Sequence, residues 1–187
     1  MKIKRTIISI VVLGLVVAAL AAWYLSLPEP VPTKMWTKFA PPDSGCELDV
    51  PGKPIGNALK DGTFGREYVA VYTWIPLGFD FGHFLAYQRY TSAGSRTNLD
   101  EKVRAELMDQ FSIHKAEVVS EKDIQLGPHS GKEIVAKGPD KTVLIARIFV
   151  VKSRPQHETY MLFASGKGAK PTHRDITRFL DTFKIDH

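Results

Sequence analysis

The chain has 187 residues, and its 25 lysine and arginine against 20 aspartate and glutamate side chains give a formal charge of +5 at neutral pH. Three of the basic residues lie within the first five positions, so the rest carries 22 basic and 20 acidic side chains and a net charge of +2. This near balance, with both signs interspersed, argues against a nucleic-acid-binding domain, which needs a basic stripe or patch. The single cysteine excludes an intramolecular disulfide, so a hydrophobic core must hold the fold.

The N-terminal segment carries the strongest signal in the sequence. Residues 7–25 contain no charged side chain, and at about 1.5 Å per residue a helix over this range would be roughly 28 Å long, close to the thickness of a hydrocarbon core. We therefore predict a transmembrane signal anchor over residues 1–27, with its N-terminus in the cytoplasm and the rest outside the cell membrane. Trp23 and Tyr24 lie where an interfacial aromatic belt would be, which favours retention of the segment.

A cleaved signal peptide is the alternative interpretation of this segment. Ala19-Leu20-Ala21 offers small residues at the spacing that a signal peptidase accepts, and cleavage would leave a secreted protein. After it, three alternating prolines predict a semi-rigid stalk over residues 28–35. Residues 36–187 are then expected to form one extracytoplasmic domain.

The first half of this domain contains two clear strand patterns and one helix pattern. Apolar and acidic side chains alternate over residues 46–50, which predicts a strand that ends at Pro51. Residues 66–75, REYVAVYTWI, are rich in β-branched and aromatic side chains and predict a second strand. A helix is predicted from Asn98 as N-cap, with Glu101 three positions later. Its apolar face consists of Val103, Leu107 and Phe111.

The second half is a run of strands closed by a helix. Glycine and proline breaks separate four predicted strands, at residues 116–126, 130–138, 142–153 and 158–165. Residues 143–151 are nearly all apolar, as expected of a central strand covered on both faces, with Arg147 as the exception. The last helix is predicted from Thr172, with Asp175 in its first turn. Its apolar stripe is Ile176, Phe179, Leu180 and Phe183.

The fold class predicted from this order is α+β: an antiparallel sheet with two packed helices, preceded by one transmembrane helix. Four stretches resemble a group of uncharacterised exported bacterial proteins: FAPPDSGCELDVPGKP, YVAVYTWIP, IQLGPHSGKEIVAK and ITRFLDTFKI. The order of elements resembles the PsbP/DcrB-like α/β sandwich, and the likeness covers residues 36–185. It departs at Cys46, where such proteins more often have an aromatic or small apolar residue. PsbP itself assists a photosynthetic oxygen-evolving complex, but no residue specific to that role is matched, so the resemblance implies a fold and no functional residues.

No catalytic, cofactor or metal site is predicted. The string GPHSGKE at residues 127–133 is one residue short of a phosphate loop, ends in Glu133 and precedes a strand, so we interpret it as a hairpin turn. The S-x-x-K pattern at residues 112–115 lacks the partner motifs of a serine nucleophile. The six histidines show no helical pairing that would place two imidazoles on one face. Cys46 shares its strand face with apolar residues, which favours a buried, inert thiol over a nucleophile or an intermolecular bridge.

Two features favour a role beyond packing. The segment 78–90 follows a strand end and is rich in aromatic rings, so we predict that it forms a connection whose rings line a partner or ligand surface. The alternative is that the rings cap one end of the sheet. Arg147 needs a paired anion or several carbonyls if it is buried, and otherwise reaches solvent. The predicted surface residues are Phe79, Phe81, His83, Phe84 and Tyr87.

Two hypotheses of function follow. The first is a membrane-tethered extracytoplasmic module that binds an envelope protein or a small ligand, or assists an assembly, with membrane lipid contacted through the N-terminal helix. Nucleic acid is not an expected partner. The second is a small envelope hydrolase whose serine, histidine and carboxylate groups are far apart in sequence and recognisable only by geometry.

Overall fold

The computed structural model describes residues 32–42, 44–59, 66–74, 81–91, 104–105, 108–109, 111–112, 115–152 and 156–186. The predicted signal anchor, the first half of the predicted stalk (residues 28–31) and the Asn98 N-cap lie outside these ranges. Within the described part of the chain, no helix is long and apolar enough to span a membrane.

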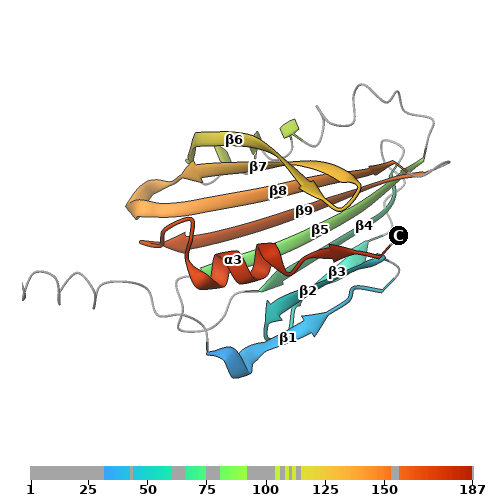
Figure 1. The fold of residues 1–187 in the computed structure, drawn as a ribbon, viewed down its shortest axis with the longest axis horizontal. Coiled ribbons are helices and arrows are strands. Elements are labelled where there is room, and N and C mark those ends of the chain that lie inside the picture. Colours follow the sequence, from blue (N-terminus) through green and yellow to red (C-terminus); the bar gives the residue numbers. More distant parts are fainter. Residues whose placement is uncertain are drawn as a thin grey trace, which may run out of the picture.

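The fold is dominated by a seven-stranded antiparallel sheet (Figure 1). Its central strands are long and apolar, whereas the edge strand β6 is largely exposed. In spatial order the strands are β3 (Ile55–Leu59), β4 (Arg66–Trp74), β5 (Phe81–Thr91), β9 (Gln156–Lys167), β8 (Thr142–Lys152), β7 (His129–Lys137) and β6 (Glu117–Leu126).

One face of this large sheet is covered by a helix and a smaller sheet (Figure 1). The small sheet has the order β1 (Trp36–Phe39), β2 (Cys46–Pro51) and β10 (Lys184–Ile185). Helix α3 (Arg174–Asp181) lies between the small sheet and the large one. Two 3₁₀ turns complete the described elements: η1 (Thr33–Met35) before β1, and η4 (Pro139–Lys141) between β7 and β8.

Strand β8 divides the hydrophobic core into two clusters, because successive side chains of a strand point to opposite faces. Val143, Ile145, Phe149 and Val151 join the cluster that contains β2 and α3. Leu144, Ala146 and Ile148 join a cluster on the other face, together with Phe111 from the segment at residues 104–112. The sequence prediction that residues 143–151 form a central strand covered on both faces is therefore confirmed.

The predicted antiparallel sheet is confirmed, as are the strands predicted at residues 46–50 and 66–75 and the four in the second half, to within about two residues at each end. Of the two expected helices, α3 is present, and six residues between 104 and 112 are described as helical. The start of α3 differs from the prediction. His173, and not Thr172, is the N-cap, because its Nδ1 accepts a hydrogen bond from the Asp175 amide at 3.3 Å.

Four strands were not predicted as such: β1, β3, β5 and β10. Strand β3 has the sequence IGNAL, and glycine and asparagine have low strand propensity. It is found at an edge of the large sheet, where pairing with β4 alone defines it. Strand β10 has only two residues, and its pairing with β2 depends on where α3 ends. Both are products of tertiary contacts.

We expect Phe179→Ala to lower the free energy of unfolding by about 3–5 kcal/mol, because the ring is fully buried and contacts Trp74 at a centroid distance of 5.9 Å. Urea denaturation of the variant and the parent protein measures the difference. Ile55→Ala, at a side chain that is 70% exposed, is the control and should change stability by less than about 0.5 kcal/mol. Equal stabilities of the Phe179 variant and the parent would contradict the placement of α3.

Candidate functional site

A row of charged side chains crosses the large sheet from β6 to α3. Lys122, Glu133 and Arg147 occupy directly opposite positions on β6, β7 and β8. Lys122 Nζ lies 2.8 Å from Glu133 Oε1, and Arg147 Nε donates to Glu133 Oε2 at 2.7 Å. The row places three charges side by side on the face that carries α3.

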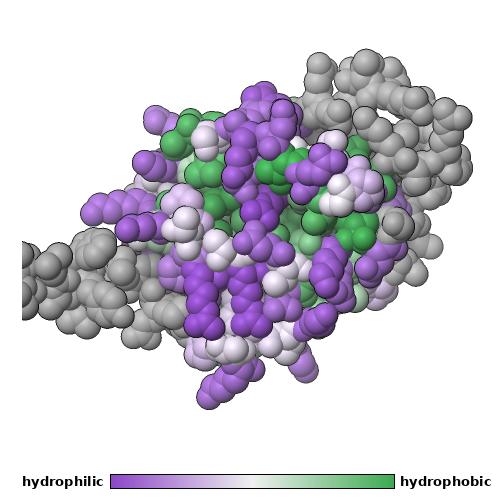
Figure 2. All heavy atoms as spheres, viewed as in Figure 1, coloured by the Kyte–Doolittle hydropathy of each residue, from purple (hydrophilic) through white to green (hydrophobic). Residues whose placement is uncertain are grey.

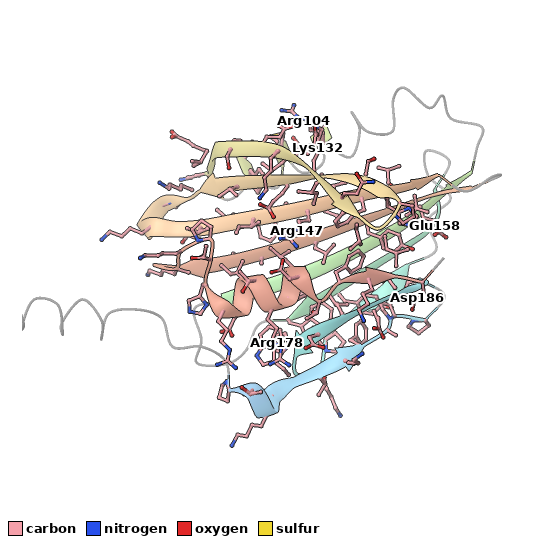
Figure 3. All side chains as sticks on the ribbon, in the orientation of Figure 1. Arg104, Lys132, Arg147, Glu158, Arg178 and Asp186 are labelled. Carbon is pink, nitrogen blue, oxygen red and sulfur yellow. The ribbon has the colours of Figure 1, made fainter. Side chains whose placement is uncertain are left out.

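Arg147 extends the row to the C-terminal end of α3 (Figure 3). Its Nη1 donates to the Leu180 carbonyl at 2.9 Å and lies 2.8 Å from Asp181 Oδ1. A cation at this end of a helix also interacts favourably with the helix dipole. The side chain is 22% exposed and has two carboxylates and a carbonyl as partners, so Arg147 is paired and also reaches solvent in part.

Glu133 is the central member of the row. Burial by itself would raise the pKa of this carboxyl group, but hydrogen bonds from Lys122 and Arg147, together with their positive charges, outweigh burial and lower the pKa below its usual value. Glu133 is therefore ionised at neutral pH, and it neutralises the two cations beside it.

Partly exposed apolar side chains lie on both sides of the charged row. On one side of the row, Ile124 on β6 is paired with Gly131 on β7. On the other side, Val135 on β7 is paired with Ile145 on β8. Ile124, Leu126 and Val135 pack against the core but are not fully covered. Figure 2 shows the result as hydrophobic surface on both sides of a hydrophilic band over β6, β7 and β8. We call this surface the open face; it consists of Lys122, Ile124, Leu126, Glu133, Val135 and Arg147.

The string at residues 127–133 forms a hairpin turn and the start of β7. Gly127 lies in the turn of the β6–β7 hairpin with a φ of +55°, so the predicted hairpin is confirmed. A Cβ atom at Gly131 would collide with the Ile148 carbonyl oxygen and approach the Phe149 ring to 2.6 Å. Glycine lets that ring lie against β7, where it stacks on Phe183 at a centroid distance of 5.7 Å. This glycine serves packing under the open face.

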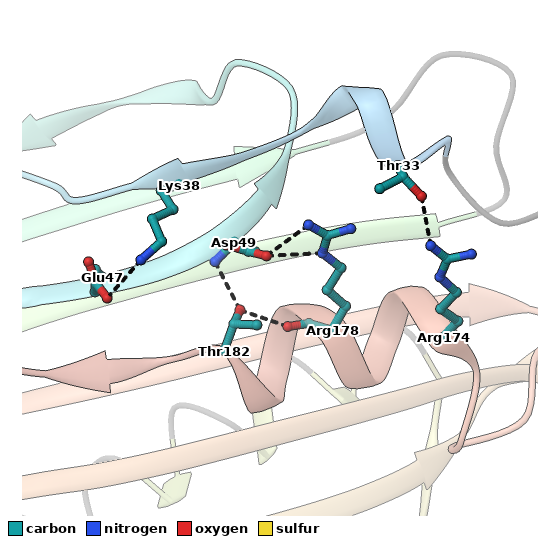
Figure 4. A network of polar contacts seen from close by, with 7 residues as sticks. All are labelled: Thr33, Lys38, Glu47, Asp49, Arg174, Arg178 and Thr182. Atoms are coloured by element: carbon teal, nitrogen blue, oxygen red, sulfur yellow. Dashed lines mark hydrogen bonds and ion pairs between the residues drawn. The ribbon is translucent and has the colours of Figure 1, made fainter.

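A second set of polar contacts joins α3 to the small sheet (Figure 4). Arg178 donates from Nε and Nη2 to Asp49 Oδ2 at 3.0 and 2.9 Å. Its guanidinium lies over the Trp36 ring, 4.8 Å from the centroid. Thr182 Oγ1 accepts from the Asp49 amide at 2.9 Å and donates to the Arg178 carbonyl at 2.8 Å. α3 is thus bonded to β1 and β2 on one side and to β8 on the other.

The same helix holds the end of the predicted stalk. Thr33–Met35 forms η1, and Arg174 Nη2 donates to Thr33 Oγ1 at 2.7 Å. Met35 packs against the core beside α3. The last residues of the range predicted as stalk are therefore attached to the domain.

Cys46 is buried, as the sequence predicted. Its side chain is 3% exposed and Sγ lies 3.3 Å from Ser44 Oγ. Burial raises the pKa of the thiol to about 11, against a smaller opposite effect of the Ser44 hydrogen bond. Ser44 Oγ donates to the Pro41 carbonyl, and the Ser44 carbonyl accepts from the Tyr160 hydroxyl at 2.6 Å. These groups connect β2 to β9, and the thiol stays protonated at neutral pH.

The hydroxyl of the S-x-x-K pattern is also engaged in a backbone contact. Ser112 Oγ donates to the Met108 carbonyl at 2.9 Å, within the helical segment. This geometry fits a helix residue and does not direct the hydroxyl to Lys115.

The predicted aromatic surface segment is largely a strand, so its interpretation as a connection is wrong. Phe81, His83, Phe84 and Tyr87 lie in β5, which pairs with β4 and β9 on its two sides. Aromatic residues have high strand propensity, and that signal could have identified β5. Phe79 lies outside the described residues. A binding role for these side chains stays a prediction.

Sequence reasoning missed the open face, although the hairpin turn contains a usable signal. The Gly127-Pro128 turn fixes the register of β6 against β7, and that register pairs Lys122 with Glu133. The ion pair between Glu133 and Arg147 also requires the register of β7 against β8, which depends on the turn at η4. The contact of Arg147 with α3 has no local signal.

A comparison with solved structures identifies the fold. The solution structure of cyanobacterial PsbP (CyanoP) from Synechocystis sp. PCC 6803 aligns with a TM-score of 0.52, at 15% identity, over 84% of this chain and 96% of that one. The domain has a PsbP-like fold. At this identity the likeness shows the fold alone.

Two further solved structures align less well. One is from Bacteroides thetaiotaomicron VPI-5482, with 14% identity, a TM-score of 0.34 and coverage of 81% of this chain and 48% of that one. The other is PA94, a protein of unknown function from Pseudomonas aeruginosa, with 13% identity, a TM-score of 0.32 and coverage of 75% and 88%. The sequence matches no protein-family model and no curated protein.

We expect Cys46 to resist thiol reagents in the folded protein, because it is buried and its pKa is raised to about 11. The rate of reaction with a chromogenic disulfide at neutral pH measures this. Addition of denaturant to the same sample should make the thiol react fully. Fast labelling of the native protein would contradict the assignment of Cys46 as an inert core residue.

We expect Glu133→Gln to destabilise the domain by about 1–2 kcal/mol at neutral pH, since it removes a charged acceptor of two hydrogen bonds. The pKa of Glu133 is lowered in the folded state, so its stabilisation is present above the unfolded value of about 4.3 and is lost as pH falls through the folded value. The difference between variant and parent should therefore shrink below about pH 4. Urea denaturation at several pH values tests this, and a difference that stays constant with pH would contradict it.

Proposed function

We propose that the chain is a membrane-tethered extracytoplasmic binding or assembly module that presents the open face to a partner protein. The observation that carries the proposal is the open face itself. One half of the α3 side of the large sheet keeps apolar side chains partly exposed around a row of paired charges. Figure 2 shows this mixture on the side that carries α3.

The chemistry of the open face favours a protein over a small ligand. Small-ligand sites are concave and bury most of the ligand. The open face is instead the outer surface of paired strands, with Ile124, Leu126 and Val135 beside Lys122 and Glu133. Apolar contact area with polar groups that fix orientation is the usual composition of a protein interface.

The positions of the reactive groups favour binding over catalysis. Cys46 has a pKa raised to about 11 and is buried, Ser112 donates within its own helical segment, and Glu133 is ionised between two cations. Each group has a structural partner that fixes its protonation state or its direction. This supports the first of the two hypotheses from the sequence.

The membrane tether rests on residues 1–27, whose uncharged run and basic N-terminus are the pattern of a signal anchor. A partner that meets the open face would then be an envelope protein in or beside the same membrane. The likeness to CyanoP supports the fold of the module and carries no partner over to it.

The proposal predicts that substitution of Ile124 and Leu126 by serine abolishes partner capture. Full-length tagged protein is cross-linked in membranes, washed with alkaline carbonate and purified from the pellet. We expect a partner that co-purifies with the parent chain to be lost with the double variant, because the substitution removes apolar contact area from the open face. Equal thermal melts of the two proteins show that the fold is kept.

A matched control places the same change elsewhere on the surface. Ile55 and Val118 are 70% and 44% exposed and lie outside the open face, so Ile55→Ser with Val118→Ser should leave capture unchanged. Loss of the partner with both double variants would argue against the open face. Recovery of the protein in the carbonate supernatant, with a new N-terminus near Ala22, would overturn the tether.

A further inference from the structure

The chain enters the domain at an end where several segments meet, at the left of Figure 1. η1 lies beside the last residues of β2, because the Gly52 amide donates to the Met35 carbonyl at 2.8 Å. The start of α3 is at the same place, since Arg174 is bonded to Thr33. The point where the N-terminal segment joins is thus fixed to both the small sheet and the helix.

The large sheet contributes two more segments to this end. β9 ends at Lys167 and leads through residues 168–173 into α3. The Gly168 amide donates to the Lys141 carbonyl at 3.1 Å, which attaches η4 and therefore the β7–β8 turn. We call this part of the domain the tether end.

The tether end is rich in exposed lysines. They come from η1, from the residue after Gly52, from the end of β7 and the turn that follows it, and from the end of β9 and the segment that leads into α3. The six residues are Lys34, Lys53, Lys137, Lys141, Lys167 and Lys170. The described acidic residues at this end are Glu117, opposite Lys137, Asp140 and the buried Asp175 in the first turn of α3, so the six lysines exceed the acids by three. Figure 2 shows hydrophilic side chains projecting here.

These lysines differ from four lysines elsewhere on the described surface. Lys38, Lys122, Lys132 and Lys184 each lie within 4.0 Å of a carboxylate oxygen. At the tether end, Lys34, Lys53, Lys137, Lys141 and Lys167 have no such ion pair with any residue that the structure describes. Their charge is not neutralised within the described domain, and it is available to an external anion.

The length of chain before Thr33 limits how far this end can lie from a membrane. Eight peptide units separate residue 25, the last of the uncharged run, from Thr33, so the gap is at most about 29 Å. The tether makes contact with the bilayer an intramolecular event, for which weak individual interactions suffice. Attraction between lysines and an anionic surface acts within a Debye length of about 8–10 Å.

We propose that the tether end docks on anionic phospholipid headgroups of the membrane that holds the N-terminal anchor. The inference rests on the proposed tether and adds a second, electrostatic contact to it. Arg174 and Arg178 hold η1 and β1 on α3, so docking fixes the orientation of the whole sandwich. The strands of the large sheet lead away from the tether end, so the open face stands beside the anchor and is accessible to a neighbour in the same membrane.

The test uses the full chain reconstituted into vesicles, with a fluorophore at Thr172→Cys in the tether end and, separately, at Ser130→Cys near the β6–β7 turn. Both positions are exposed, and Cys46 is buried, so labelling is confined to the new thiol. A quencher attached to a lipid headgroup reports proximity to the bilayer. Compared with pure phosphatidylcholine, about 30% phosphatidylglycerol should raise quenching at position 172 about twofold or more and leave position 130 unchanged. About 0.5 M NaCl should remove the increase.

Two triple variants with the same loss of charge locate the effect. Lys137→Gln, Lys141→Gln and Lys167→Gln together should abolish the dependence on phosphatidylglycerol. The matched control neutralises lysines that are already paired and lie outside the open face: Lys38→Gln, Lys132→Gln and Lys184→Gln should retain it.

Three results would overturn the proposal. Equal quenching in neutral and anionic vesicles would exclude anionic lipid as the partner, and so would equal loss of the effect in both triple variants. Release of the chain from the vesicles by carbonate would remove the anchor itself and with it the proposed function. If the chain resists carbonate and quenching is nevertheless equal in the two kinds of vesicle, the anchor stands and only the docking is overturned.

Discussion

Helix α3 is the element on which the arrangement of the rest depends. It has eight residues, fewer than an isolated helix needs to be stable in water, so its structure must come from packing. Ile176, Phe179 and Leu180 are buried between the two sheets, and Phe179 meets Trp74 from β4. The small sheet also packs directly on the large one, where Phe39 meets Tyr72 and Trp74, but β10 follows the helix, so its pairing with β2 depends on where α3 lies.

Charged contacts determine how that helix is oriented. Arg147 approaches its C-terminal end from the large sheet, and Asp49 holds Arg178 from the small one. Such pairs are partly desolvated, so their net contribution to stability is small compared with apolar burial. Their geometry is specific, since each arginine has more than one partner in fixed positions. The apolar stripe of α3 explains why the helix packs on the sheet, and the two arginines explain its register there.

The same contacts hold the two surfaces to which we assign the proposed roles. Arg147 and Glu133 hold the charged row of the open face in place, whereas Arg174 and Arg178 secure η1 and β1 at the tether end. The long strands of the antiparallel large sheet connect the two regions. A partner at the open face and a membrane at the tether end would therefore be held in a fixed relative geometry.

The sequence by itself determined α3 and the long strands other than β5, because period-2 alternation, apolar runs and glycine-proline breaks are local signals. It also determined that Cys46 is buried and that the string around Gly127 is a turn. Tertiary structure alone decided the short strands β3 and β10, the pairing of Arg147 with α3 and the gathering of six lysines at one end. Those lysines are far apart in a sequence where acidic residues are interspersed, so their shared position depends on where strands end. That depends on long-range pairing, which no local window of the chain contains.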